Sequence, residues 1–176
     1  NKCALVIENT NFNYLELYNL VSKTIVILNK NKITKNSTVL IVEDNSLAHI
    51  LTLFALSYIN ATAVPANTHY SNDSLSNLID STKVNSFIGN SKLCIFFNKK
   101  YKFKSIISTN KINKFPFFFE KINNNINIPN KKIDLNKNFL ITTSSGSTAN
   151  PKPIVFTQNT KIARFKLMSK LYEIDS

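Results

Sequence analysis

Glycine, arginine and tryptophan are nearly absent from this sequence of 176 residues. It contains two glycines, no tryptophan, and a single arginine, Arg164, against 21 lysines. The dinucleotide fingerprint and the nucleotide loop of the P-loop NTPases both need glycines at fixed spacing, so neither motif is present. Specific reading of DNA bases favours the bidentate fork of arginine, so the composition also argues against a base-specific DNA-binding protein.

Cysteine, histidine and long apolar runs are scarce as well. Cys3 and Cys94 are far apart, and His49 and His69 have no partner at the spacing of a metal site. We therefore expect buried thiols in a reducing compartment and no structural zinc. The longest apolar run, Leu47 to Ile59, is too short and too interrupted to span a bilayer, and there is no signal-peptide pattern. The expectation is a soluble, cytoplasmic protein without a transmembrane segment.

Lysine and asparagine are abundant instead. The formal net charge is +12, and roughly one residue in seven is asparagine. Lysine, asparagine and isoleucine rise together in AT-rich coding sequence, so we do not assign the charge a function. A lysine-rich nucleic-acid binder is kept as an alternative, because neutralised phosphates supply non-specific binding. The densest basic run, "NKKYKFKS" from Asn98 to Ser105, is interpreted as the solvent face of an edge strand.

Strand-like and helix-like patterns alternate over the first 90 residues. The apolar runs "CALVIE", "STVLIVED", "TAVPAN" and "NSFIG" predict strands. A capping box at Asn13 and Glu16 predicts one helix, "NSLAHILTLFALSYIN" predicts a second, and the cap "SND" predicts a third. Parallel strands need crossover connections, which are usually helical. The fold class is therefore predicted to be α/β, with a mainly parallel sheet and flanking helices.

We divide the chain into three regions: 1–90, a first α/β region; 91–137, an irregular basic connector; and 138–176, a hairpin and a following helix. Within the connector, "LCIFF" and "FKSIIS" are predicted to be strands. Phe117, Phe118 and Phe119 are expected to close the edge of the core, with a partner-binding surface as the alternative. In the last region, "NFLITTSSGST" and "PIVFTQ" predict two strands, and "NT" at Asn159 predicts the cap of a final helix.

The turn of this hairpin is rich in hydroxyl groups. Gly146 is surrounded by five hydroxyl side chains, and a lysine, Lys152, lies between Pro151 and Pro153; the hydroxyl residues are Thr143, Ser144, Ser145, Ser147 and Thr148. Free N–H and O–H donors at a turn make a concave anion site, to which lysine adds a charge-assisted contact. Phosphate is the anion that we expect such a site to bind. A serine hydrolase is the alternative, but Ser145 lacks the GxSxG context.

The segment "TTSSGSTANPKP" resembles the phosphate-binding signature of the adenylate-forming superfamily, which comprises acyl-CoA synthetases, aryl-CoA ligases, luciferases and nonribosomal adenylation domains. The stretch from "ALVIENTNFNYLEL" to "TKVNSFIG" also resembles the N-terminal part of that family, including the Val-Pro pair at Val64. The resemblance covers nearly the whole chain except residues 91–137. It implies that the chain forms part of the large N-terminal domain of an adenylate-forming enzyme.

The resemblance implies a reaction. A carboxylic acid attacks the α-phosphate of ATP, and the acyl group of the resulting acyl-adenylate then passes to the thiol of coenzyme A or of a carrier-protein pantetheine. By position, six residues are expected to hold the β- and γ-phosphates: Ser144, Ser145, Gly146, Ser147, Thr148 and Lys152. Mg²⁺ is expected with ATP, and its carboxylate ligand is expected outside this sequence. No catalytic residue, no specific nucleic-acid partner and no protein-bound metal is expected in the chain itself, whereas an acyl carrier protein is a candidate partner.

Two residues depart from the family pattern, since Ala149 and Pro153 stand where the family has glycine. A further family glycine falls near Asn60, and asparagine is the residue that best replaces glycine in left-handed geometry. Members of the family are about three times longer, so we expect a fragment that is inactive by itself. A noncatalytic remnant or binding module of the same fold is the alternative. The sequence does not identify the acid.

Overall fold

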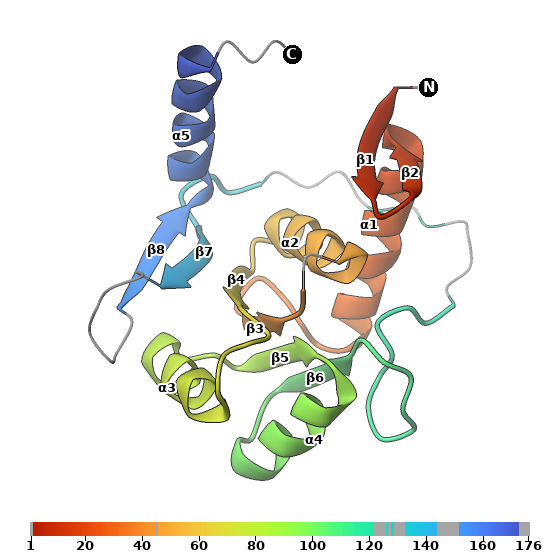
Figure 1. Cartoon of the computed structure of the whole chain (residues 1–176), viewed down its shortest axis with the longest axis vertical. Coiled ribbons are helices and arrows are strands. Elements are labelled where there is room, and N and C mark those ends of the chain that lie inside the picture. The colour runs from red at the N-terminus through yellow and green to blue at the C-terminus, as the bar shows by residue number, and fades with distance from the viewer. Residues whose placement is uncertain are drawn as a thin grey trace.

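The structure is a computed structural model that describes residues 2–44, 46–121, 126, 128, 133–143 and 152–172. A six-stranded sheet of order β6-β5-β3-β4-β7-β8 lies at its centre (Figure 1). Five strands are parallel, and the last is antiparallel to β7. They are β3 (Thr38–Val42), β4 (Thr62–Ala66), β5 (Ser86–Gly89), β6 (Ser105–Ser108), β7 (Asn138–Thr143) and β8 (Pro153–Thr157). The predicted α/β class with a mainly parallel sheet is confirmed.

Two helices cover each face of the sheet. Alternate residues of β3, Val39 and Ile41, pack against α1 (Tyr14–Lys30) and α2 (Leu47–Ile59). The residues between and after them, Leu40 and Val42, pack with α3 (Asn72–Thr82) and α4 (Ser91–Lys100) on the opposite face. Because both faces are covered, the central strand β3 is apolar from Val39 to Val42 rather than alternating.

Two elements lie outside these layers. A two-stranded antiparallel hairpin, β1 (Cys3–Ile7) and β2 (Thr10–Asn13), precedes α1, and α5 (Gln158–Leu171) follows β8. Both project from the same end of the molecule, with α2 between them (Figure 1). No helix in the described part of the chain is long and apolar enough to cross a bilayer.

Local signals in the sequence account for several helix ends. The capping box of α1 is present as predicted: Glu16 N donates to Asn13 Oδ1 at 2.9 Å, and Asn13 N donates to Glu16 Oε2 at 2.8 Å. Asn60 ends α2 in the left-handed region, with φ 59°, so the left-handed geometry expected at this asparagine is confirmed. The cap of α5 is Thr157 rather than Asn159, because Thr160 supplies the reciprocal hydrogen bond to Thr157.

Two predictions in the connector are wrong. "LCIFF" is helical and belongs to α4, whose buried residues Cys94 and Phe97 are three apart, the spacing of one helix face. The basic run that begins at Asn98 forms the end of α4 and the link to β6 rather than an edge strand. Lysines in the last turn of a helix interact favourably with its dipole. The strand predicted at "FKSIIS" is confirmed as β6.

The phenylalanine cluster is divided between core and surface. Phe118 is fully buried in the core on the α1 and α2 side of the sheet, as predicted. Phe119, however, is 44% exposed, so the prediction holds only in part. The thiols also differ: Cys94 is buried, but Cys3 is exposed, which corrects the expectation for Cys3.

Candidate functional site

The parallel strands β3 to β7 all end at one edge of the sheet, and ligands of such sheets bind outside this carboxyl edge. From β3 the chain moves to β4 on one side and later to β5 and β6 on the other. The direction in which successive strands are added to the sheet therefore reverses between β3 and β5. Gly89 ends β5 at this place, where an added Cβ would lie 3.1 Å from Val42 O, so glycine permits the close approach of the two strand ends.

The hydroxyl-rich turn begins and ends at the same edge. Thr143 is the last residue of β7, and it pairs with Pro153, the first residue of β8. Lys152, directly before Pro153, is exposed. Of the predicted phosphate-binding residues, the structure describes only Lys152; five lie outside the described residues, namely Ser144, Ser145, Gly146, Ser147 and Thr148. What the structure fixes is the two ends of the turn.

Pro153 is compatible with this hairpin. β8 is the terminal strand of the sheet, and a proline that lacks N–H is tolerated on an edge strand or at the first residue of a strand. Pro153 meets both conditions. Proline at this position therefore leaves the strand pairing intact.

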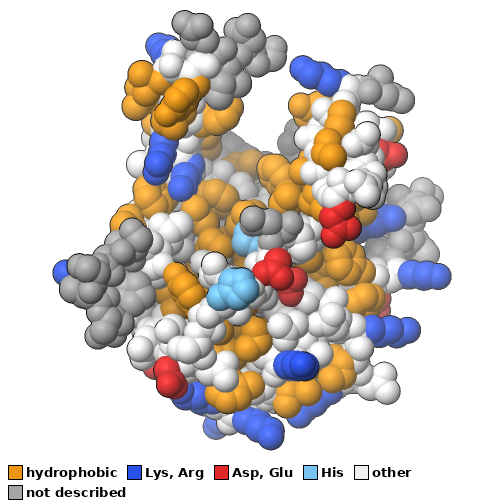
Figure 2. All heavy atoms as spheres, in the orientation of Figure 1, with side chains coloured by type: hydrophobic (Ala, Val, Ile, Leu, Met, Phe, Trp, Pro, Cys, Tyr) orange, Lys and Arg blue, Asp and Glu red, His pale blue; other side chains and the backbone are white. Residues whose placement is uncertain are grey.

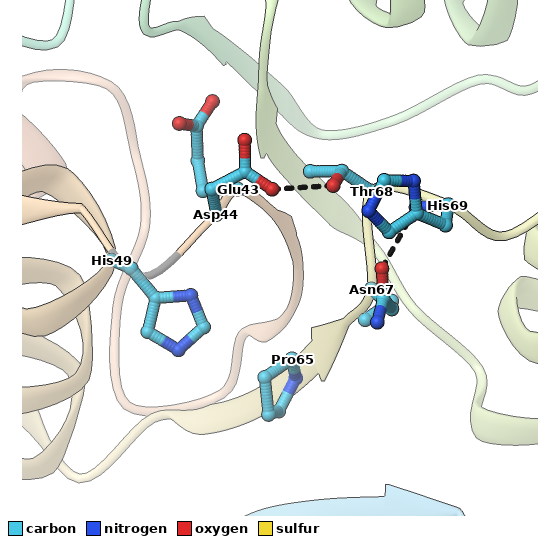
Figure 3. Close-up of a pocket in the computed structure, with 8 residues that line it drawn as sticks. Glu43, Asp44, His49, Pro65, Asn67, Thr68 and His69 are labelled. Carbon is cyan, nitrogen blue, oxygen red and sulfur yellow. Dashed lines mark hydrogen bonds between the residues drawn. The ribbon is translucent and has the colours of Figure 1, made fainter.

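A polar pocket of about 450 Å³ lies at the carboxyl ends of β3 and β4 (Figure 3). The segment after β4 contributes Asn67, Thr68 and His69, and Tyr70 OH lies 3.4 Å from Thr143 Oγ1. This contact joins the wall of the pocket to the start of the turn. Figure 2 shows histidine and acidic side chains together near the centre of this face.

The segment after β3 supplies the acidic wall. Thr68 Oγ1 donates a hydrogen bond of 2.5 Å to Asp44 Oδ1, which ties the ends of β3 and β4 together. Glu43 accepts a hydrogen bond of 2.5 Å from Thr109 Oγ1, beyond the end of β6. Burial raises the pKa of the Glu43 carboxyl above its ordinary value, although the hydrogen bond from Thr109 opposes the shift.

His49, in the first turn of α2, completes the pocket. Its Nδ1 is buried and has no hydrogen-bond partner among the described residues. Asp44, His49 and His69 were not predicted as site residues, and neither was Glu43. The signal available in the sequence was the position of Glu43 and Asp44 directly after a buried strand, which places them at the carboxyl edge.

Cys94 is close to Glu43 but takes no part in a polar site. Burial raises the pKa of its thiol to about 12. The thiol donates to Gly89 O at 3.3 Å, within the core. It is therefore a protonated, structural side chain and not a nucleophile.

Among the described residues, no group of three or more His, Cys, Asp or Glu side chains is arranged to hold a metal ion. In the described part of the chain, the edge offers a polar pocket and the two ends of the hydroxyl-rich turn, Thr143 and Pro153, with the exposed Lys152 directly before Pro153.

Comparison with known proteins gives a consistent result. The model of a family described as "AMP-binding enzyme" matches residues 1–175. A putative long-chain-fatty-acid CoA ligase of Rhodopseudomonas palustris is similar in structure, with a TM-score of 0.85 and 11% identity over 98% of this chain and 44% of that chain. A search of curated proteins gives no match.

Two further structures have the same fold. The NpsA N-terminal subdomain of Klebsiella oxytoca gives a TM-score of 0.70 and 20% identity, over 94% of this chain and 38% of that one. A red-emitting luciferase of Phrixothrix hirtus gives a TM-score of 0.71 and 23% identity, over 89% of this chain and 41% of that chain. The chain thus spans less than half the length of each of these relatives.

Proposed function

The chain belongs to the AMP-binding enzyme family, and we propose that the whole protein is an ATP-dependent ligase that activates a carboxylic acid as an acyl-adenylate. The acyl group then passes to a thiol, that of coenzyme A or of a carrier-protein pantetheine, as in an acyl- or aryl-CoA synthetase. The observation that carries the proposal is the β7–β8 hairpin, because its register brings both ends of the hydroxyl-rich turn to the carboxyl edge of a parallel sheet.

In this proposal the turn binds the leaving group. A carboxylate oxygen of the acid attacks the α-phosphorus of ATP, and the bond from that phosphorus to the bridging oxygen breaks, which releases pyrophosphate. Ser144, Ser145, Ser147, Thr148 and the backbone at Gly146 would orient the β- and γ-phosphates. Lys152 would offset the negative charge that builds on pyrophosphate, an electrostatic effect that acts most strongly in the transition state.

Mg²⁺ would enter with ATP and neutralise part of the phosphate charge. The described residues offer no cluster of ligands for it. We propose that its carboxylate ligand lies outside this chain, together with the residues that bind the adenosine and the acid. It follows that residues 1–176 alone are proposed to be inactive.

The test is the exchange of labelled pyrophosphate into ATP, measured with fatty, aromatic and amino acids. The protein that carries this chain at the length of its relatives is compared with residues 1–176 alone. We expect exchange that depends on one class of acid from the longer protein and none from residues 1–176. Exchange by the short chain would refute its proposed inactivity. A longer protein that exchanges with no acid would instead be a noncatalytic binding module of the same fold.

A further inference from the structure

Thr143 carries a hydroxyl to which the proposed function gives no role. It ends β7, directly before the hydroxyl-rich turn, whereas Tyr70 lies four residues beyond the end of β4. Tyr70 OH lies 3.4 Å from Thr143 Oγ1, and either oxygen can be the donor. Tyr70 is 37% exposed, so it belongs to the carboxyl edge rather than to the core. The contact therefore joins the strand that leads into the turn to the segment after β4.

The β7–β8 hairpin is joined to the parallel sheet at its open end. Thr62 Oγ1 of β4 donates to Asn138 O, at the start of β7, at 3.1 Å. The register between β4 and β7 has one pair, Ala63 and Leu140. In the described chain, the last three residues of β7 pair with β8 and not with β4. At the turn end of the hairpin, the Tyr70–Thr143 contact therefore takes the place of the strand ladder.

The backbone on both sides of Tyr70 is fixed near the ends of the parallel strands. Thr68 Oγ1 donates to Asp44 Oδ1, just after β3, at 2.5 Å. Tyr70 N donates to Asn67 O at 3.1 Å, which closes a turn directly after β4. Ser71, the next residue, is the N-cap of α3. Because Tyr70 lies between a closed turn and a capped helix, the ends of β3 and β4 set the place of its ring.

The length of the contact bears on its role. O–H···O hydrogen bonds in proteins are most often about 2.7–2.8 Å long, so a bond of 3.4 Å is weak. Hydrogen bonds at a reaction site are often long without ligand and tighten in the complex with substrate. A contact that tightens when the turn binds a ligand adds to the affinity for that ligand, because both stabilise the same arrangement.

We infer that Tyr70 is a positioning residue: through Thr143, its hydroxyl holds the start of the hydroxyl-rich turn at the carboxyl edge, in the arrangement that binds the phosphates of ATP. Thr143 then serves this contact and does not itself bind phosphate. The inference rests on the proposed function, since it takes the turn to be the phosphate site. It adds a residue outside the turn, 73 positions from Thr143, on which the affinity for ATP depends.

The test is a double-variant cycle in the whole protein that carries this chain, with the affinity for ATP in the presence of Mg²⁺ measured by calorimetry. Tyr70→Phe removes only the hydroxyl, and Thr143→Val replaces its partner with a side chain of similar shape. We expect each variant to weaken ATP binding about threefold to tenfold, the effect of one ordinary hydrogen bond. The double variant should bind no more weakly than either single variant, because both remove the same contact.

The matched control is Tyr101→Phe, which removes a hydroxyl that donates to Asp80 Oδ2 at 3.3 Å, on the α3 and α4 side of the sheet. It should change the ATP affinity less than twofold. A second readout separates positioning from a general loss of structure. In pyrophosphate exchange, the KM for ATP should rise in Tyr70→Phe, while the KM for the acid and the midpoint of thermal unfolding stay as in wild type.

Additive losses in the two single variants would overturn the inference, because Tyr70 and Thr143 would then not act through one contact. So would an unchanged affinity of Tyr70→Phe beside weakened binding by Thr143→Val, since Thr143 would then bind phosphate itself. Failure of the ligase proposal gives a different result: ATP still binds with the coupled losses, but the protein exchanges no pyrophosphate with any acid. A wild-type protein that binds no ATP would contradict both.

Discussion

Gln158 and Ser57 are joined by two hydrogen bonds, which fix the start of α5 to the end of α2. Ser57 Oγ donates to Gln158 Oε1 at 3.0 Å, and Gln158 Nε2 donates to Ser57 O at 2.9 Å. Gln158 directly follows β8, so the same side chain holds the β7–β8 hairpin against the helix layer of the sheet. Its amide satisfies a backbone carbonyl and a hydroxyl near the end of α2.

Replacing Gln158 should therefore loosen α5 and destabilise the hairpin. Gln158→Ala removes both hydrogen bonds, although Ser57 O keeps the bond that it accepts from Asn60 N at 3.2 Å. The loss of the two bonds costs about 1–3 kcal/mol of unfolding free energy. Urea unfolding measures this cost, and hydrogen exchange should become faster in α5. The control is Asn159→Ala, at the exposed neighbouring position. Equal destabilisation by the two variants would contradict the assigned role of Gln158.

The buried carboxyl of Glu43 should make stability depend on pH. Because burial raises its pKa above the ordinary value for a glutamate, the folded state holds this proton more tightly than the unfolded state. The stabilisation is fully present below the unfolded pKa and is lost as the pH rises through the folded pKa. We expect the unfolding free energy to fall as the pH is raised from about 4.5 through that window.

Glu43→Gln should remove this part of the pH dependence, whereas Glu8→Gln, at an exposed position, should leave it in place. Urea unfolding at a series of pH values makes the comparison. Thr109→Val provides a second check, because the hydrogen bond from Thr109 favours the charged form of Glu43 and its loss should raise the pKa further. Identical pH profiles for wild type and Glu43→Gln would show that Glu43 does not carry the effect.

The sequence predicts those parts of the fold that carry their own local signal. The capping box at Asn13 marks the start of α1, and the apolar runs mark β3, β4 and β5, which are buried on both faces. Asn60 indicates a left-handed helix end in a chain with few glycines. The sequence does not indicate the strand β2, Thr10–Asn13, because this segment is mostly polar and pairs only with β1. A five-residue apolar run such as "LCIFF" fits a strand or a helix equally well.

The candidate site is predicted only where its residues are close in sequence. Lys152 and its neighbours form one motif and could be recognised as such. Glu43 and Thr109 are 66 positions apart, and only the pairing of β3 with β5 and of β5 with β6 brings them together. Nothing in the local sequence indicates that pairing, so the acidic wall of the pocket became visible only with the fold.

The scarcity of glycine predicts a way to stabilise the protein. Lys83 ends α3 in the left-handed region with φ 54°, where its Cβ is strained. Lys83→Gly should raise the unfolding free energy by about 0.5–1 kcal/mol, because glycine adopts this geometry without that strain. Lys99→Gly, within the last turn of α4, should instead lower it by up to about 1 kcal/mol. Thermal unfolding of both variants tests the pair, and a lower midpoint for Lys83→Gly would contradict the explanation.

The central claim is that the turn from Ser144 to Lys152 holds the pyrophosphate that leaves ATP. The most direct measurement is the rate of ATP–pyrophosphate exchange by the whole protein with Lys152→Ala, beside Lys102→Ala as a control in the link between α4 and β6. The account predicts a loss of about 100-fold or more for Lys152→Ala, typical of removing one electrostatic contact to a developing charge. It predicts less than a twofold change for the control. Equal rates for wild type and Lys152→Ala would contradict the claim.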